Sequence, residues 1–167
     1  MTGPARAFDQ RGGDEYTGQR IHCARWDYRV GLHGRRVAVL GDGAAVARVL
    51  PAVAAEARKV TVFQRDPVWV LPRPPLAEVT RLLPARVARW AARANLRLQV
   101  RDSWVRRQLT PDAPARVRLH NHYYQALQRP NCKLVTWPIA RLAPLGIRTV
   151  DGIEHRVDCI IFAQEEP

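Results

Sequence analysis

Two residue types are scarce in this sequence, and each shortage argues against a class of protein. Ser103 is the only serine and has no base partner nearby, so we expect no serine hydrolase. The three cysteines, Cys23, Cys132 and Cys159, form no C-x-x-C pair. That arrangement argues against a disulfide framework or a cysteine zinc site, and we expect reduced thiols.

Long apolar runs are missing as well. None reaches the roughly 18 residues that cross a bilayer, and no apolar stretch follows Met1–Arg6 as it would in a signal peptide. His120 and His122 have no carboxylate or cysteine at ligand spacing, so we expect no metal site. These shortages together predict a cytoplasmic protein without a membrane partner.

Lysine is nearly absent, with only Lys59 and Lys133, so arginine supplies almost all of the net charge of +12. A polyanionic partner such as nucleic acid, a membrane surface or a phosphorylated cofactor would suit this charge. A bias toward GC-rich codons explains it equally well, so charge alone does not choose a partner. The length of 167 residues and a hydrophobic content of 47% indicate about one domain with a packed core.

A strand, helix and strand follow one another near the middle of the chain. Arg36–Leu40 is a short apolar run that ends at a glycine, as buried parallel strands do. Residues 43–58 are rich in alanine, with apolar residues at helical spacing around Pro51. Lys59–Phe63 is a second buried strand. Together they predict a βαβ unit.

The rest of the chain predicts further elements of an α/β domain. We expect a rigid proline-rich loop over residues 67–75, and then two arginine-rich helices up to Leu109, with Pro84 at a start or a kink. Further along we expect a short helix, a third strand, an antiparallel hairpin or meander and a last buried strand, over 123–128, 133–136, 139–157 and 159–163. The prediction is a three-layer α/β fold with a helical insertion.

The turn between the first strand and the helix carries a dinucleotide-binding motif. It has the form G-x-G-x-x-[G/A], in the required context after a strand and before a helix. The first glycine makes the tight turn, the second allows close approach to a pyrophosphate, and the helix N-terminus offers amide N–H groups. Val46 takes the place of the third glycine. The candidate cofactor-binding residues here are Gly41, Asp42, Gly43, Ala44 and Ala45.

The end of the second strand adds two further candidates, Arg65 and Asp66. This point lies beside the adenosine ribose in dinucleotide folds, where an arginine accommodates the 2′-phosphate of NADP. Arg65 therefore indicates NADP(H), and an ordinary surface arginine is the alternative. Asp42 and Asp66 place carboxylates near this anionic ligand, and each contact at ~5 Å costs on the order of 1–3 kcal/mol. We therefore expect the fold to form and NADP(H) binding to be weakened.

A second motif precedes this unit, in the stretch Tyr16–Asp27. It resembles the F-x-G-x-x-x-H-x-x-x-W-[P/D] fingerprint of Baeyer–Villiger monooxygenases, a branch of the flavin-dependent monooxygenases. Val60–Pro67 and Tyr123–Asn131 are similar to further stretches of that family. The fingerprint positions are Tyr16, where the family usually has phenylalanine, and Gly18, His22, Trp26 and Asp27.

The resemblance implies a Rossmann-like NADP-binding domain. In that family an FAD-binding domain is split, and the NADP-binding domain is inserted between its parts. Residues 1–34 would form the linker that carries the fingerprint. Residues 35–167 would form the NADP-binding domain, with its helical insertion at about 75–112. The resemblance further implies a truncated monooxygenase that lacks the FAD-binding Rossmann unit and is inactive alone, with a separate FAD-bearing chain as the expected partner.

One catalytic candidate follows from the resemblance. Arg118 matches a family arginine that acts at the flavin–nicotinamide site, and a surface arginine is the alternative. Two other functions stay open beside the truncated monooxygenase. One is a degenerate Rossmann domain whose basic insertion binds a partner or polyanion, although we do not expect nucleic acid. The other is a remnant without catalysis.

Overall fold

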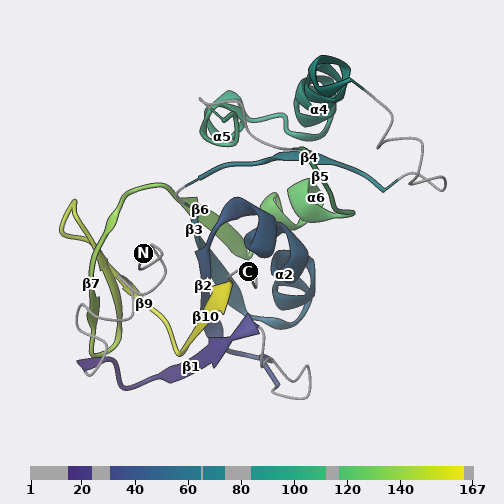
Figure 1. Cartoon of the computed structure of the whole chain (residues 1–167). Helices are drawn as coiled ribbons and strands as arrows, with labels where there is room; N and C mark the ends of the chain where they lie inside the picture. The colour runs from purple at the N-terminus through teal and green to yellow at the C-terminus, as the bar shows by residue number, and fades with distance from the viewer. Residues whose placement is uncertain (1–14, 24–30, 65, 74–83, 112–116, 164–167) are drawn as a thin grey trace.

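The computed structural model describes residues 15–23, 31–64, 66–73, 84–111 and 117–163 (Figure 1). A five-stranded parallel sheet forms the centre of the molecule, with strand order β1-β10-β2-β3-β6. Its strands are β1 (Gln19–His22), β10 (Cys159–Ala163), β2 (Arg36–Gly41), β3 (Lys59–Gln64) and β6 (Cys132–Val135). The inner strands are almost continuously apolar because both faces of the sheet are covered.

Helices cover one face of this sheet and a small antiparallel sheet covers the other (Figure 1). Residues alternate along each strand, so Val37 and Val39 face the helical side while Ala38 and Leu40 face the other layer. The helical side holds α2 (Gly43–Glu56) and α6 (Tyr123–Leu127). The opposite side holds a meander of β7 (Ile139–Ala143), β8 (Gly146–Thr149) and β9 (Glu154–Arg156). The predicted three-layer α/β fold is thus confirmed.

The insertion between β3 and α6 forms a separate small layer above α6 (Figure 1). It contains α4 (Ala85–Gln99) and α5 (Ser103–Gln108), and Pro84 stands at the start of α4 as the sequence predicted. The expectation of a loop throughout 67–75 is wrong. β4 (Trp69–Leu71) pairs there in parallel with β5 (Val117–Leu119), because Trp69 and Val70 are buried in the core that also holds residues of α4.

Two further details differ from the sequence expectation. β1 pairs with β10 along its whole length, so residues 19–22 of the predicted linker belong to the domain's main sheet. β1 ends at His22, and Trp26 lies outside the described residues. In α2, Val46 is fully buried in the core, so the spacing of helix and sheet accommodates a side chain where the motif has its third glycine.

Candidate functional site

Four strands bring the sequence-predicted residues to one edge of the sheet. The register places His22 of β1 beside Phe162, Phe162 beside Leu40, and Leu40 beside Phe63. The glycine turn after β2 and the loop after β3 therefore leave the sheet at its carboxyl edge, as does the end of β1. This is the edge where open parallel sheets bind their ligands.

Neighbouring backbone crowds both glycines of the turn. A Cβ on Gly41 would collide with the carbonyl oxygen of Ala163, the last residue of β10. A Cβ on Gly43 would lie 2.5 Å from the carbonyl oxygen of Asp66 and 2.8 Å from Nε2 of Gln64. The space over Gly43 is thus filled by the loop after β3, so the two parts of the predicted nucleotide site touch each other. Arg65 of this loop lies outside the described residues.

Asp42 caps the helix that the turn opens. Its Oδ1 accepts a hydrogen bond from the amide N of Ala45 at 2.9 Å, and its backbone is extended, as at most helix N-caps. One amide of the helix N-terminus is therefore used within the protein. Among the described residues the N–H groups of Gly43 and Ala44 have no acceptor. The turn fits a pyrophosphate through these two amides, with a carboxylate beside them as the unfavourable feature.

A buried polar pair stands directly behind this turn. The hydroxyl of Tyr123 donates to Oε1 of Gln64 at 2.6 Å, and the two residues are 1% and 5% exposed. Burial raises the pKa of Tyr123 far above its usual value, so the hydroxyl stays a neutral donor. Sequence reasoning named neither residue as part of a site. The available signal was a glutamine at the end of a strand whose other residues include Val60, Val62 and Phe63.

The fingerprint residues before β1 attach this strand to the sheet and the meander. The hydroxyl of Tyr16 donates to the carbonyl oxygen of Val157 at 3.1 Å, and its ring belongs to the core between sheet and meander. A Cβ on Gly18 would collide with the hydroxyl of Tyr16, so Tyr16 requires a glycine two residues later. This explains the Y-x-G spacing as packing.

His22 lies at the carboxyl edge of the sheet. Its ring stacks on that of Phe162, with centroids 5.1 Å apart and planes at 20°. Trp26 and Asp27 lie outside the described residues. The described fingerprint residues therefore fix β1 and bring one imidazole to the edge that carries the glycine turn.

Arg118 lies in a different sheet from the glycine turn. It is the middle residue of β5, paired with Val70 of β4, and it is half-buried. The structure therefore groups the glycine turn, Asp66 and His22 at one edge and places Arg118 in the insertion.

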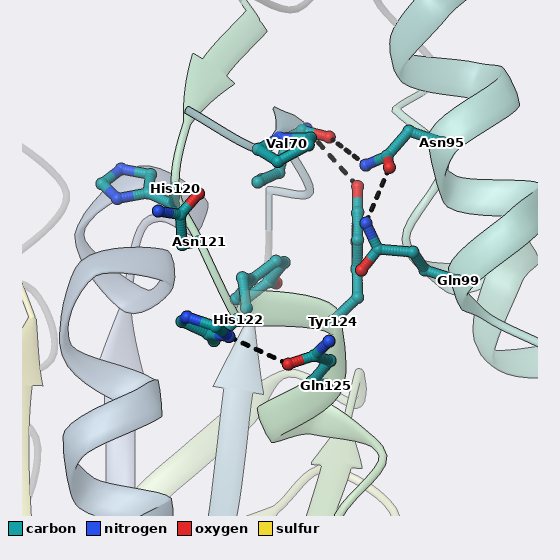
Figure 2. Close-up of a pocket in the computed structure, with 10 residues that line it drawn as sticks. Val70, Asn95, Gln99, His120, Asn121, His122, Tyr124 and Gln125 are labelled. Atoms are coloured by element: carbon teal, nitrogen blue, oxygen red, sulfur yellow. Dashed lines mark hydrogen bonds between the residues drawn. The ribbon is translucent and has the colours of Figure 1, made fainter. Parts of the chain in front are cut away.

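A pocket of about 190 Å³ lies where the insertion meets α6 (Figure 2). Asn95 donates to the carbonyl oxygen of Val70 at 3.0 Å and accepts from Gln99 at 2.7 Å, while the hydroxyl of Tyr124 accepts from the Val70 amide at 3.4 Å. His122 has a positive φ of 65° and contacts Gln125 at 2.9 Å. No group of three metal-ligating side chains occurs within the described ranges. Of these bonds, the one between Tyr124 and Val70 joins the insertion to α6.

Comparison with known proteins identifies relatives of this chain by sequence. No protein-family model matches the chain. The chain is 34% identical over 186 residues to an uncharacterized monooxygenase of Mycobacterium bovis, and 30% identical over 200 residues to a Baeyer–Villiger monooxygenase of Streptomyces coelicolor. These alignments cover 90% and 96% of this chain but 37% and 38% of those proteins. The chain therefore spans less than two fifths of the length of these relatives.

Solved structures show the same fold. A structure of OTEMO with FAD and NADP matches with a TM-score of 0.76 and 22% identity, over 92% of this chain and 44% of that one. Cyclohexanone-bound cyclohexanone monooxygenase matches with a TM-score of 0.76 and 25% identity, over the same shares of the two chains. Both matches are to a part of a larger protein.

The fold and these relatives show that the chain is homologous to a part of the FAD-binding monooxygenases. Within that class its relatives include Baeyer–Villiger monooxygenases, and the resemblance predicted from the sequence is confirmed. A further relative, 31% identical, is an FAD-binding monooxygenase of Aspergillus niger, and the OTEMO complex contains FAD and NADP. None of the described helices is long and apolar enough to cross a membrane.

Proposed function

We propose that this chain forms the NADP(H)-binding domain of a Baeyer–Villiger-type monooxygenase. One observation carries the proposal: the glycine turn Gly41–Gly43 meets the loop after β3 at the carboxyl edge of a parallel sheet. The homology to these enzymes over nearly the whole chain supports it.

The described residues suggest how the cofactor is held. The amides of Gly43 and Ala44 face the pyrophosphate at the helix N-terminus, and the Gln64–Asp66 loop faces the adenosine ribose. Arg65 of this loop favours the 2′-phosphate of NADP. When bound, NADPH supplies a hydride, and FAD supplies the reaction with oxygen. Monooxygenation therefore requires an FAD-bearing domain, on the same polypeptide or on a partner chain.

A calorimetric titration with NADPH, repeated with NADH, tests cofactor binding. We expect micromolar affinity for NADPH, and weaker affinity for NADH that changes less with salt. Arg65→Ala removes the preference for NADPH, whereas Arg107→Ala, an exposed arginine of α5, leaves it unchanged. Absence of binding heat with either dinucleotide, from protein shown to be folded by circular dichroism, would refute the proposal.

The proposed FAD-bearing partner requires its own experiment. The chain is expressed with an affinity tag in its native host, and material that copurifies with it is examined for flavin absorbance. We expect a flavoprotein that oxidises NADPH in the presence of this chain. Copurified flavoprotein whose NADPH oxidation is the same without this chain would contradict the assignment.

The outer face of α4 supports the alternative function, a basic interaction module. Trp90 and Leu98 are 74% and 84% exposed there, and Arg86 and Arg97 are exposed at helical spacing from Trp90. Tryptophan and arginine are enriched in protein interfaces. Heparin serves as the polyanion probe. Binding that falls steeply with salt and is lost in Arg86→Ala/Arg97→Ala, with no binding of NADPH, would favour this alternative.

A further inference from the structure

Tyr123 and Gln64 form a polar contact inside the hydrophobic core, at a position where two apolar side chains could also pack. Val60 and Val62 of β3 lie in a hydrophobic core, and the first turn of α6 packs against the same core. A hydroxyl and an amide buried there carry a desolvation cost, which the 2.6 Å hydrogen bond between them offsets. Unlike an apolar contact, this bond has a direction and fixes the rotamer of Gln64.

The fixed amide of Gln64 in turn points at the loop after β3. Its Nε2 lies 3.5 Å from the carbonyl oxygen of Asp66, and that same oxygen lies 2.5 Å from the position of a Cβ on Gly43. A continuous line of contacts therefore runs from Tyr123 through Gln64 and Asp66 to the glycine turn. The loop on this line is the one that faces the ribose in the proposed function.

Tyr124, the next residue, supports a different element of the structure. The hydroxyl of Tyr124 accepts from the amide of Val70 in β4, as Figure 2 shows. β4 is also held by its ladder with β5 and by the hydrogen bond from Asn95. The Tyr124 hydroxyl is therefore one of several supports of β4, whereas Tyr123 is the only described side chain that hydrogen-bonds Oε1 of Gln64.

We propose that Tyr123 and Gln64 are positioning residues that hold the loop after β3 against the glycine turn and thereby set the preference for a phosphorylated over an unphosphorylated dinucleotide. This inference rests on the proposed NADP(H)-binding function. Gln64 borders both parts of the site, because its Nε2 lies 3.5 Å from the carbonyl oxygen of Asp66 and 2.8 Å from the position of a Cβ on Gly43. The pair acts by fixing the distance between these two parts of the site.

The test compares single and paired substitutions, with the affinity ratio of NADPH to NADH as the readout. Tyr123→Phe removes the hydroxyl alone, and we expect the ratio to fall about tenfold, the size of one buried hydrogen bond. Tyr124→Phe is the matched control and should leave the ratio within about twofold. Hydrogen exchange of the peptide that covers residues 66–68 should speed up in Tyr123→Phe and not in Tyr124→Phe.

The double variant Tyr123→Phe/Gln64→Met separates an effect on the position of the loop from an effect on the stability of the protein. Replacing both polar partners by apolar groups of similar shape should restore the unfolding midpoint. The affinity ratio should stay low, because no directed amide holds the loop. A double variant that recovers the ratio, or a Tyr123→Phe variant with unchanged hydrogen exchange, would overturn the inference. If the wild-type protein binds neither dinucleotide, the proposed function and the selectivity role both fail, and hydrogen exchange still decides whether the pair holds the loop.

Discussion

The carboxylate of Asp42 stabilises the fold but disfavours binding of an anionic cofactor. It caps α2 through the Ala45 amide and therefore stabilises the helix. The same carboxylate stands beside the two amides proposed to bind the pyrophosphate. Asparagine caps helices as well as aspartate does, so Asp42→Asn keeps the cap and removes the charge.

The expected gain in affinity follows from the charge alone. Two like charges at ~5 Å repel by roughly 1–3 kcal/mol, and because Asp42 is exposed, salt screening places the effect near the lower limit. Asp42→Asn should therefore tighten NADPH binding by about fivefold at low salt, and by less at high salt. The unfolding free energy should change by less than about 0.5 kcal/mol.

Calorimetry at two salt concentrations measures this effect, and the chain provides a matched control. Asp102 caps α5 in the same way, through the amides of Trp104 and Val105, and lies in the insertion. Asp102→Asn should leave NADPH affinity unchanged. The reasoning is refuted if Asp42→Asn leaves the dissociation constant unaltered, or if its effect does not shrink as salt rises.

Three other predictions concern single side chains. Gly43→Ala should destabilise the protein by about 1–3 kcal/mol in urea, because its Cβ meets the backbone oxygen of Asp66, and an unchanged midpoint would contradict this close packing. The Arg36 guanidinium holds the pKa of Asp158 below its usual value. The stability from this pair is therefore complete above the unfolded pKa near 4 and is lost as pH falls through the lower folded pKa. The thermal unfolding midpoint of Asp158→Asn should lie about 2 °C below that of the wild-type protein at pH 7 and equal it at pH 2. An equal difference in midpoint at both pH values would exclude the ion pair as its cause. Burial raises the pKa of Cys159 to about 11, so only ~10⁻³ of it is thiolate at pH 8, and mass spectrometry should find alkylation after unfolding but not in the native protein.

Much of the domain could be predicted from sequence because its signals are local. Short apolar runs mark buried strands, the first of which ends in glycine, and the alanine-rich segment between two of them marks α2 despite Pro51. β4 escaped prediction because prolines surround three residues whose strand partner lies far along the chain, in β5. No local pattern reports such a pairing.

The place of the glycine turn in the fold could be predicted from the sequence, but its contacts could not. The G-x-G motif fixes the turn, yet the crowding of Gly43 by Asp66 depends on a loop that arrives from another strand. The link from Tyr123 to Gln64 joins residues 59 positions apart, so neither motif alone indicates it. Tyr16 could be recognised as part of a fingerprint, but its hydrogen bond to Val157 required the folded meander.

The place of β10 has a consequence for how this domain is made. The last strand of the described chain lies in the sheet between β1 and β2, and the Tyr16–Val157 hydrogen bond spans 141 positions. Such pairings raise the contact order and slow folding. While the ribosome synthesises the chain, β1 and β2 have no strand between them until residues 159–163 emerge. Their unpaired backbone edges are then open to chaperones and to aggregation, so folding is expected to be completed after synthesis of β10.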